Sequence, residues 1–315
     1  MSYSSHESKY KSNLHHLGNG CRQGSIISPL LFNLYIDEMI RDVISTKIGC
    51  QLALTSYNIL AYADDIILLS PSQSGLQFLL DKVYEHLNGL DLTINTIKSK
   101  VIVFKSRGGY QSNDTKLYIN NQEIEIVKSI KYLGIIISDD MSNKLDIERL
   151  SRSFLKQSFG FIRRFGSFPL HLKAFLFKTY CMSLFGSELW YEVKGCSQAL
   201  KALKITFHKG VKKFVGFPFR FSNHEACISA NILTFDHLWN NKIFNYAFLI
   251  KNSKSLSLRP IKSYLIKSSN FIRNVNDVAK SVYDISNLFD NDRSAITSRI
   301  SYVFNREPRF AGLNT

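Results

Sequence analysis

Two adjacent aspartates interrupt an apolar stretch in the first quarter of the chain. Asp64 and Asp65 lie between the short apolar segments 58–62 and 66–70, each of which has the length of one strand. This pattern predicts a buried hairpin that carries both acids at its tip. Because like charges at contact distance raise each other's pKa, such a pair requires a positive partner, and a divalent cation is the simplest one. Mg²⁺, or Mn²⁺, suits a few oxygen ligands and keeps room for water and phosphates. An isolated Asp-Asp pair is more often a solvated turn, and only the apolar flanks argue against that alternative.

A glycine-rich turn precedes a predicted helix. Two glycines flank Arg22 and Gln23, and they let the backbone approach a planar ligand to which both side chains offer hydrogen-bond donors. Ser28 followed by proline predicts an N-cap, and the apolar spacing predicts a helix to about Thr46. The turn by itself is also typical of ordinary connections.

The remaining periodicity divides the chain near residue 140. It predicts helices at 75–89, 144–165, 169–187, 197–215 and 236–250, strands within 93–104 and at 130–138, and a hairpin at 117–127. A mixed α/β part therefore gives way to an all-helical part, which makes the predicted fold class α+β. Residues 251–315 are polar and serine-rich, and we expect short, weakly ordered helices there.

The positive charge is concentrated in the second half of the chain. The net charge is +15, yet residues 1–150 carry 15 Lys and Arg against 16 Asp and Glu, whereas residues 151–315 carry 25 against 9. This excess favours a polyanionic partner such as RNA or DNA, although a membrane surface or a merely lysine-rich soluble protein are alternatives. No apolar stretch reaches the length of a membrane span, and no secretory signal is visible. The five cysteines form no paired pattern and favour an intracellular compartment.

Four motifs occur in a specific order. The segments GCRQGSIISPLLFNLYID, AYADD, INTIKSK and IKYLGIII together resemble the palm of reverse transcriptases from LINE-type, non-LTR retrotransposons. The resemblance implies a partial polymerase palm over residues 18–140 after a polar lead at 1–17. A helical thumb-like region at 141–250 and a basic, weakly ordered extension at 251–315 would follow.

The resemblance implies roles for individual residues. Asp64 and Asp65 would be catalytic metal ligands, and Lys98 would act on the leaving phosphate, although a solvated strand-end lysine is as good an explanation. Template and nucleotide would contact Arg22, Gln23, Gly24 and Tyr62; for Tyr62, core packing is the equal alternative. The primer grip would be Tyr132, Leu133 and Gly134. The charge excess adds Arg163, Arg164, Lys212 and Lys213 as contacts to the nucleic-acid backbone.

One expected feature is missing from this sequence. The family's palm begins with a strand that carries another metal-binding aspartate, and residues 1–17 contain no Asp. We therefore expect a truncated RNA-directed DNA polymerase that is inactive alone. Its partners would be an RNA template, a DNA primer and deoxynucleoside triphosphates, and we expect no membrane partner. It would act in the cytoplasm, the nucleus or both. The alternatives are a non-catalytic RNA- or DNA-binding module and a decayed gene product.

Overall fold

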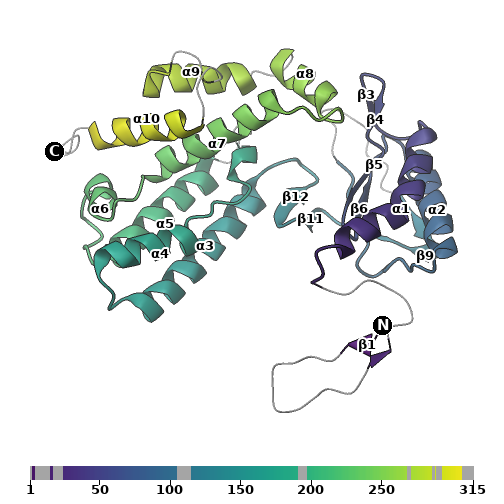
Figure 1. Ribbon diagram of the computed structural model, residues 1–315, viewed down its shortest axis with the longest axis horizontal. Coiled ribbons are helices and arrows are strands. Elements are labelled where there is room, and N and C mark those ends of the chain that lie inside the picture. Colours follow the sequence, from purple (N-terminus) through teal and green to yellow (C-terminus); the bar gives the residue numbers. More distant parts are fainter. Residues whose placement is uncertain are drawn as a thin grey trace. The chain divides into compact units, whose positions relative to one another are not determined.

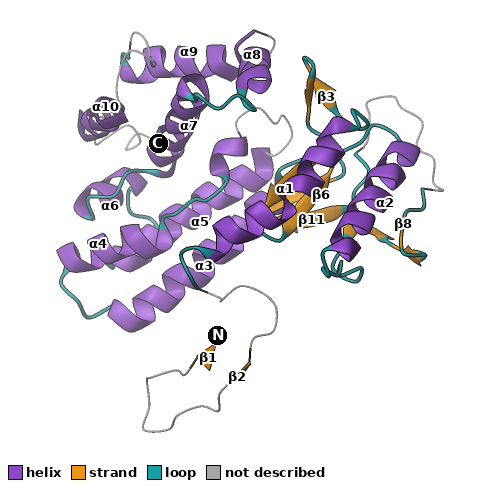
Figure 2. Ribbon diagram, turned by 45° about the vertical axis from the view of Figure 1, so that its right-hand side comes forward, coloured by secondary structure: helices purple, strands orange, loops and turns teal. Residues whose placement is uncertain are grey.

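The chain divides into two compact units. The computed structural model describes residues 2–3, 15–16, 24–104, 115–190, 197–267, 271–285, 288 and 293–306. The first unit comprises Met1–Ser99 and Ser112–Glu125, and the second comprises Lys100–Gln111 and Ile126–Thr315. Figure 2 shows that the first mixes helices with short strands and that the second is mainly helical. The predicted α+β class is consistent with this composition.

The first unit is built from two helices and several antiparallel strand pairs in its described part (Figure 1). The paired strands are β1 (Ser2–Tyr3) with β2 (His15–His16), β3 (Gln51–Leu52) with β4 (Thr55–Ser56), β5 (Ile59–Tyr62) with β6 (Asp65–Leu68), and β8 (Tyr118–Ile119) with β9 (Gln122–Glu123). The helices are α1 (Ser28–Ser45) and α2 (Gln73–Gly89). Helix α1 starts one residue earlier than predicted, because Ile27 and not Ser28 occupies the N-cap.

The core of the first unit lies between α1, α2 and the β5–β6 hairpin. Helix α1 contributes Ile36, Met39 and Val43, which recur at helical spacing and are at most 1% exposed. The other buried members of the cluster are Leu79, Val83 and Leu87 of α2 and Ile59 at the start of β5. This packing fixes the base of the hairpin and leaves its tip in solvent.

The second unit begins with short strands and continues as a series of helices (Figure 1). Its elements are β7 (Lys100–Val101), β10 (Glu125–Ile126), whose first residue belongs to the first unit, β11 (Ser129–Tyr132), β12 (Ile135–Ser138), α3 (Lys144–Phe165), α4 (Leu170–Cys181), the 3₁₀ helix η1 (Ser187–Trp190), α5 (Ser197–Val215), α6 (Asn223–Ser229), α7 (Phe235–Asn252), α8 (Arg259–Lys267), α9 (Phe271–Tyr283) and α10 (Arg293–Arg306). In this described part, no helix has both the length and the apolar character needed to cross a bilayer.

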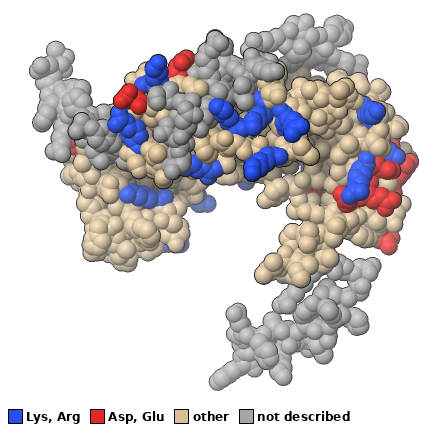
Figure 3. All heavy atoms as spheres, turned by 45° about the horizontal axis from the view of Figure 1, so that its top comes forward, with Lys and Arg blue, Asp and Glu red and all other residues tan. Residues whose placement is uncertain are grey.

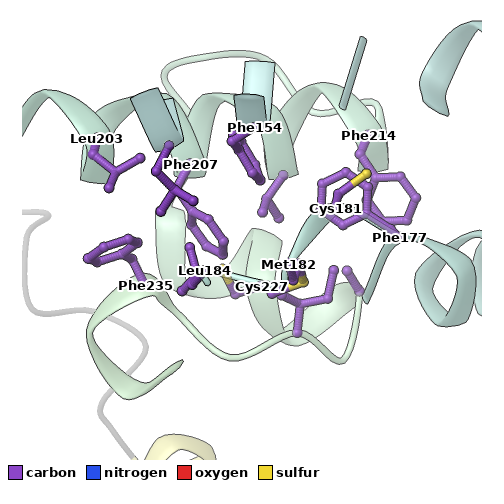
Figure 4. Close-up of a cluster of buried hydrophobic side chains, with 14 of the residues drawn as sticks. Phe154, Phe177, Cys181, Met182, Leu184, Leu203, Phe207, Phe214, Cys227 and Phe235 are labelled. Carbon is purple, nitrogen blue, oxygen red and sulfur yellow. The ribbon is translucent and has the colours of Figure 1, made fainter. Parts of the chain in front are cut away.

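Phenylalanines dominate the core between α3, α4 and α5 (Figure 4). The Phe154 and Phe207 rings stack with centroids 5.3 Å apart, and the Phe177 and Phe214 rings stack at 4.6 Å. Each buried ring stabilises the fold by about 1.5–3 kcal/mol through burial, and each aromatic pair adds about 0.5–1.5 kcal/mol. The three helices therefore form one packed body.

The C-terminal helices form a second core with α7. Val275, Ala279 and Tyr283 of α9 are at most 1% exposed, and Ile296 and Ile300 of α10 are fully buried. The expectation of only short, weakly ordered helices after residue 250 is therefore wrong for α9 and α10. Polar residues are frequent in these two helices and make the sequence look weakly periodic, but their apolar residues still line one face and are buried.

Three further boundaries differ from the prediction. Residues 130–138 form a hairpin and not one strand, because Leu133 and Gly134 adopt φ of 45° and 85° and reverse the chain. This hairpin belongs to the helical unit, since β12 packs against α3, so the division falls before residue 140. Helix α4 ends at Cys181, and the turn that follows contains Leu184 and Gly186 at positive φ.

Candidate active site

Asp64 and Asp65 lie at the tip of the β5–β6 hairpin, as the sequence predicts. Strands β5 and β6 pair from Ile59 with Leu68 to Tyr62 with Asp65, so Ala63 and Asp64 make the turn. Both aspartates are exposed, and within the described part of the chain neither carboxylate has a hydrogen-bond or ion-pair partner. Carboxylates that are free of an internal cation remain available to an external one.

The hairpin is less buried than predicted. Tyr62 is 64% exposed and Leu60 is 44% exposed, whereas the base of β5 at Ile59 is buried. The physical reason is that β5 and β6 form a two-stranded sheet, and only Ile59, Ile66 and Leu68 of its residues belong to the core with α1 and α2. Simple core packing therefore does not account for Tyr62, and its ring is accessible to a ligand.

Asn58 anchors the hairpin, and the sequence analysis missed it. This side chain is fully buried, and its amide donates to the carbonyl oxygens of Val43 at 2.7 Å and Ile48 at 2.9 Å. The Ile48 carbonyl lies beyond the C-terminus of α1 and has no helical partner, whereas the Val43 carbonyl also accepts from the N–H and the hydroxyl of Thr46. Gly49 lies beside it with φ of 99°, and a Cβ there would lie 2.5 Å from the Leu69 carbonyl oxygen. An asparagine directly before an apolar strand is the only trace of this anchor in the sequence.

The predicted template and nucleotide loop is described only in part. Arg22 and Gln23 lie outside the described residues. Gly24 is exposed with φ of 78°, a backbone conformation that favours glycine, and it lies four residues before α1 begins. The structure therefore describes the end of this loop without testing the two side chains that were predicted to contact the ligand.

Lys98 lies on a turn of the first unit and not at a strand end. Its backbone N–H donates to the Asn95 side chain at 3.0 Å, and the Ser99 hydroxyl donates to the Asn95 carbonyl at 2.9 Å. The ammonium is exposed, and none of the described residues pairs with it. Asn95 thus fixes the turn, and the lysine charge is left for a ligand.

The predicted primer-grip residues form the turn of the β11–β12 hairpin in the second unit. Leu133 and Gly134 reverse the chain, and a Cβ on Gly134 would approach the Phe185 ring to 3.3 Å. Tyr132 is half-buried, and Leu133 is 39% exposed. The turn is therefore packed on one side and open on the other.

A buried aspartate holds this hairpin to the helices, and sequence reasoning missed it as well. Asp146 is fully buried and accepts three hydrogen bonds: from Ile136 N–H at 3.0 Å, Arg149 Nε at 2.6 Å and Trp190 Nε1 at 2.9 Å. A buried charge is stable only when it is paired and hydrogen-bonded in this way. The cluster Asp146–Arg149–Trp190 connects β12, α3 and η1 into one structure.

The predicted backbone-contacting cations differ in exposure. Arg163 and Arg164 are exposed in the last turn of α3, and Lys213 of α5 is exposed with its ammonium 4.1 Å from the centre of the Phe159 ring. Lys212 is only 7% exposed and donates to the Phe219 carbonyl at 2.8 Å, while burial lowers its pKa. This internal bond favours a structural role for Lys212. In the view of Figure 3, Lys and Arg side chains appear at several separate places, and Asp and Glu side chains appear in a few areas.

The acids at the hairpin tip can serve as ligands for one hard cation. Carboxylate oxygens suit Mg²⁺, which completes its sphere with water and substrate phosphates. No group of three or more His, Cys, Asp or Glu residues within the described chain could hold a metal ion. Asp64 and Asp65 are thus the two oxygen-bearing acids that the hairpin tip offers to a cation, and the other coordination positions would fall to water or phosphate.

Comparisons with known proteins show what the stretch that contains this hairpin is similar to. The family model for reverse transcriptase (RNA-dependent DNA polymerase) matches residues 4–137. The match includes most of the segment that we had set apart as a polar lead, and it ends near the predicted palm boundary. Residues 4–137 are thus similar to reverse transcriptases, and this stretch contains the Asp64–Asp65 hairpin.

The individual relatives come from non-LTR retrotransposons. The Pol polyprotein of the type-2 element R2DM of Drosophila melanogaster is 33% identical over 122 residues, which are 37% of this chain and 11% of the relative. The RNA-directed DNA polymerase from the mobile element jockey of the same fly is 26% identical over 46% of this chain and 16% of its own length. A type-1 R1 polyprotein of Nasonia vitripennis is 22% identical over 93% of this chain and 72% of the relative. The chain therefore resembles reverse transcriptases of the LINE type, and it spans only about a tenth to a sixth of R2DM and jockey.

Proposed function

We propose that this chain is part of an RNA-directed DNA polymerase of a non-LTR retrotransposon. The observation that carries the proposal is the pair of exposed carboxylates, Asp64 and Asp65, at the tip of a hairpin inside the region that matches reverse transcriptases. The reaction would be attack of a primer 3′-hydroxyl on the α-phosphate of a deoxynucleoside triphosphate, with release of pyrophosphate. The substrates would be an RNA template, a DNA primer and deoxynucleoside triphosphates.

The side chains of the first unit would each have a different role in the proposed reaction. Asp64 and Asp65 would hold Mg²⁺, which supplies charge to stabilise the phosphates and to orient the attacking oxygen. Tyr62, with its exposed ring, would lie against the nucleotide or template. The exposed ammonium of Lys98 would donate a proton or a hydrogen bond to the leaving phosphate. Gly24, with Arg22 and Gln23, would let the backbone approach the nucleotide.

The second unit would hold the primer and the duplex. Tyr132, Leu133 and Gly134 would contact the primer at the β11–β12 turn, whose conformation Asp146 maintains through Ile136. Arg163, Arg164 and Lys213 would contact backbone phosphates, since their charges are exposed. Each such contact strengthens binding in a salt-dependent way.

Manganese binding tests this proposal before any turnover is needed. We expect electron paramagnetic resonance titration of the purified chain to show a bound Mn²⁺ that is weakened at least tenfold by Asp64→Asn. The matched control is Asp91→Asn, which removes an exposed carboxylate from the same unit at a position where asparagine tolerates the positive φ of 56°. Equal manganese binding by the wild type and by Asp64→Asn would contradict the proposal.

Primer extension on an RNA template is the second test. Because Asp64 and Asp65 are the only metal ligands assigned in this proposal, we expect the chain alone to extend a primer weakly or not at all. Asp64→Asn should remove whatever extension occurs. Synthesis that survives Asp64→Asn would exclude this carboxylate from the reaction. Asp91→Asn should leave extension unchanged.

A non-catalytic nucleic-acid-binding module is the second candidate function. Arg163, Arg164 and Lys213 are exposed on helices of the basic half, and Lys213 lies beside the half-exposed ring of Phe159, which offers a surface for a base. This function predicts salt-sensitive RNA binding that is the same in wild type and in Asp64→Asn. Binding that is insensitive to ionic strength would contradict it.

A further inference from the structure

The loop between α5 and α6 displays one aromatic ring and one guanidinium. Residues 218–221 form a β-turn, in which the Phe221 N–H donates to the Pro218 carbonyl at 3.0 Å. Phe219 and Arg220 are the two central residues of this turn. Both are exposed, Phe219 by 65%, and none of the described residues forms an ion pair with Arg220. The fold therefore leaves both side chains accessible to a ligand.

Contacts within the loop and with α5 hold this turn in place. The rings of Phe217 and Phe221, which flank the two central residues, have their centroids 4.2 Å apart. The buried ammonium of Lys212 donates to the Phe219 carbonyl at 2.8 Å. Burying an ammonium is unfavourable unless it is hydrogen-bonded, and this one is bonded to the backbone of the loop. The turn thus presents the Phe219 ring from a fixed backbone, which lowers the entropy that a ligand loses the chain on binding.

The sequence around this loop is free of acids. Residues 149–187, which include most of α3 and all of α4, and residues 193–224, which include α5 and the loop, contain no Asp or Glu and seven Lys and Arg each. Of the acids that follow, Glu225 in α6 is half-buried, and Asp236 in α7 is paired with Lys204. The charge around the loop therefore favours a polyanionic partner.

Three exposed cations lie at the same end of the helical bundle as the loop. Helices α3 and α5 lie side by side (Figure 1). Ring contacts pair them in the same direction, Phe154 with Phe207 and Phe161 with Phe214. Their last turns therefore lie together. Arg163 and Arg164 are in the last turn of α3, and Lys213 is in the last turn of α5, directly before the loop.

A single-stranded nucleic acid matches an exposed ring among cations. Its bases have accessible faces that stack on aromatic side chains, and its phosphates bind Lys and Arg. A duplex offers the same phosphates but keeps the faces of its bases inside the stack. An anionic membrane also attracts cations, but proteins bind its surface through an amphipathic face with several apolar side chains, and this turn presents one ring.

We propose that the loop of residues 216–221 is a binding site for single-stranded nucleic acid, in which an unpaired base stacks on Phe219. Arg220 binds a phosphate beside that base, and Arg163, Arg164 and Lys213 bind neighbouring phosphates. Every base has a face that can stack, so the site selects an unpaired strand and not a sequence. The inference rests on the nucleic-acid-binding function proposed above for the class of ligand, and it is independent of the hairpin acids.

Fluorescence anisotropy with a labelled oligouridylate and an RNA duplex of the same length tests the stacking. For the full chain we expect Phe219→Ala and Phe219→Leu to weaken oligouridylate binding about 5- to 150-fold, the effect of removing a stacking ring. Duplex binding should stay within about twofold, and Phe219→Trp should keep the affinity because indole also stacks. Phe78→Ala, which removes an exposed ring of α2 in the first unit, is the matched control and should change neither affinity.

Three results of this comparison would overturn the proposal. They are equal oligouridylate binding by the wild type and Phe219→Ala, an equal loss for strand and duplex, and wild-type affinity in Phe219→Leu. The last result would mean that the ring makes an ordinary apolar contact. If the wild type binds no RNA at all, the nucleic-acid-binding function fails as a whole. Salt-sensitive RNA binding that Phe219→Ala leaves unchanged would contradict this inference alone.

Salt dependence and vesicles complete the test. Arg220→Gln should reduce the slope of log Kd for oligouridylate against log salt by about 0.7, the value for one phosphate contact of a single strand. An unchanged slope would exclude the Arg220 contact. Vesicles of phosphatidylcholine and phosphatidylserine represent the membrane alternative, and we expect Phe219→Ala to leave any vesicle binding unchanged. Loss of vesicle binding in Phe219→Ala, with oligouridylate binding retained, would make the loop a membrane contact and refute the proposal.

Discussion

Replacement of Asp146 by alanine should destabilise the helical unit by about 3–5 kcal/mol, the cost of breaking a buried ion pair. The change removes the acceptor of three donors, which come from Ile136, Arg149 and Trp190. Trp190 is 4% exposed and Arg149 has 21% of its side chain exposed, so water can replace the lost oxygen only in part. Each donor left without a partner costs about 1–3 kcal/mol where it is fully buried. The total loss is a substantial part of the net stability of a domain, which is about 5–15 kcal/mol.

Urea unfolding followed by tryptophan fluorescence measures this loss. The chain has two tryptophans, Trp190 and Trp239, and both belong to the helical unit, so the fluorescence reports on that unit alone. With a denaturant slope of about 2 kcal/mol/M, the midpoint for Asp146→Ala should fall by about 1.5–2.5 M.

The control for this prediction lies on the same helix. Glu148→Gln removes one carboxylate charge two residues away from Asp146. Among the described residues, none donates a hydrogen bond to the Glu148 carboxylate, so the free energy of unfolding should change by at most about 0.5 kcal/mol. A loss below about 1 kcal/mol for Asp146→Ala would refute the reasoning, since it would mean that the three donors find other partners at little cost.

Three further results are expected. Burial raises the pKa of Cys181 to about 11 and that of Cys227 to about 12, so both thiols should resist Ellman's reagent in the native chain at pH 8. The half-buried Cys50 should react, and peptide mapping would show which thiols are modified. Asn58→Ala leaves the Ile48 carbonyl without its donor, while Thr46 still donates to the Val43 carbonyl, and should cost about 1–3 kcal/mol, seen as amide exchange in β6 that is about 5–150 times faster; unchanged exchange would exclude the anchor. Lys213→Gln should reduce the slope of log Kd for RNA against log salt by about 1, whereas Lys212→Met, which removes a buried ammonium, should leave the slope unchanged.

Local patterns were enough to predict several of the helices, the β5–β6 hairpin and the position of the acids. Helix α3 spans residues 144–165 and α5 spans 197–215 as predicted, because apolar residues recur at helical spacing along each. The β5–β6 hairpin follows from two short apolar segments around an acidic pair. The positions of these helices and of the hairpin are set by residues close together in the sequence, and tertiary contacts then stabilise the same elements.

The supports of these elements could not be predicted in the same way. Asn58 and Asp146 look like ordinary polar residues in the sequence, and only the fold brings their partners within reach: Asn58 bonds to a residue 15 positions away and Asp146 to one 44 positions away. The exposure of Tyr62 and the burial of Lys212 also depend on what packs against them. Hydrophobic spacing indicates which face of an element is apolar, but it does not show which side chains a neighbour covers.

Anomalous diffraction from a manganese-soaked crystal shows whether the hairpin acids hold the cation that the proposed reaction needs. We expect an anomalous peak within coordination distance of the carboxylate oxygens of Asp64 and Asp65, and its loss in crystals of Asp64→Asn. Well-ordered carboxylates with only water between them at saturating manganese, or a peak that persists in the variant, would contradict it.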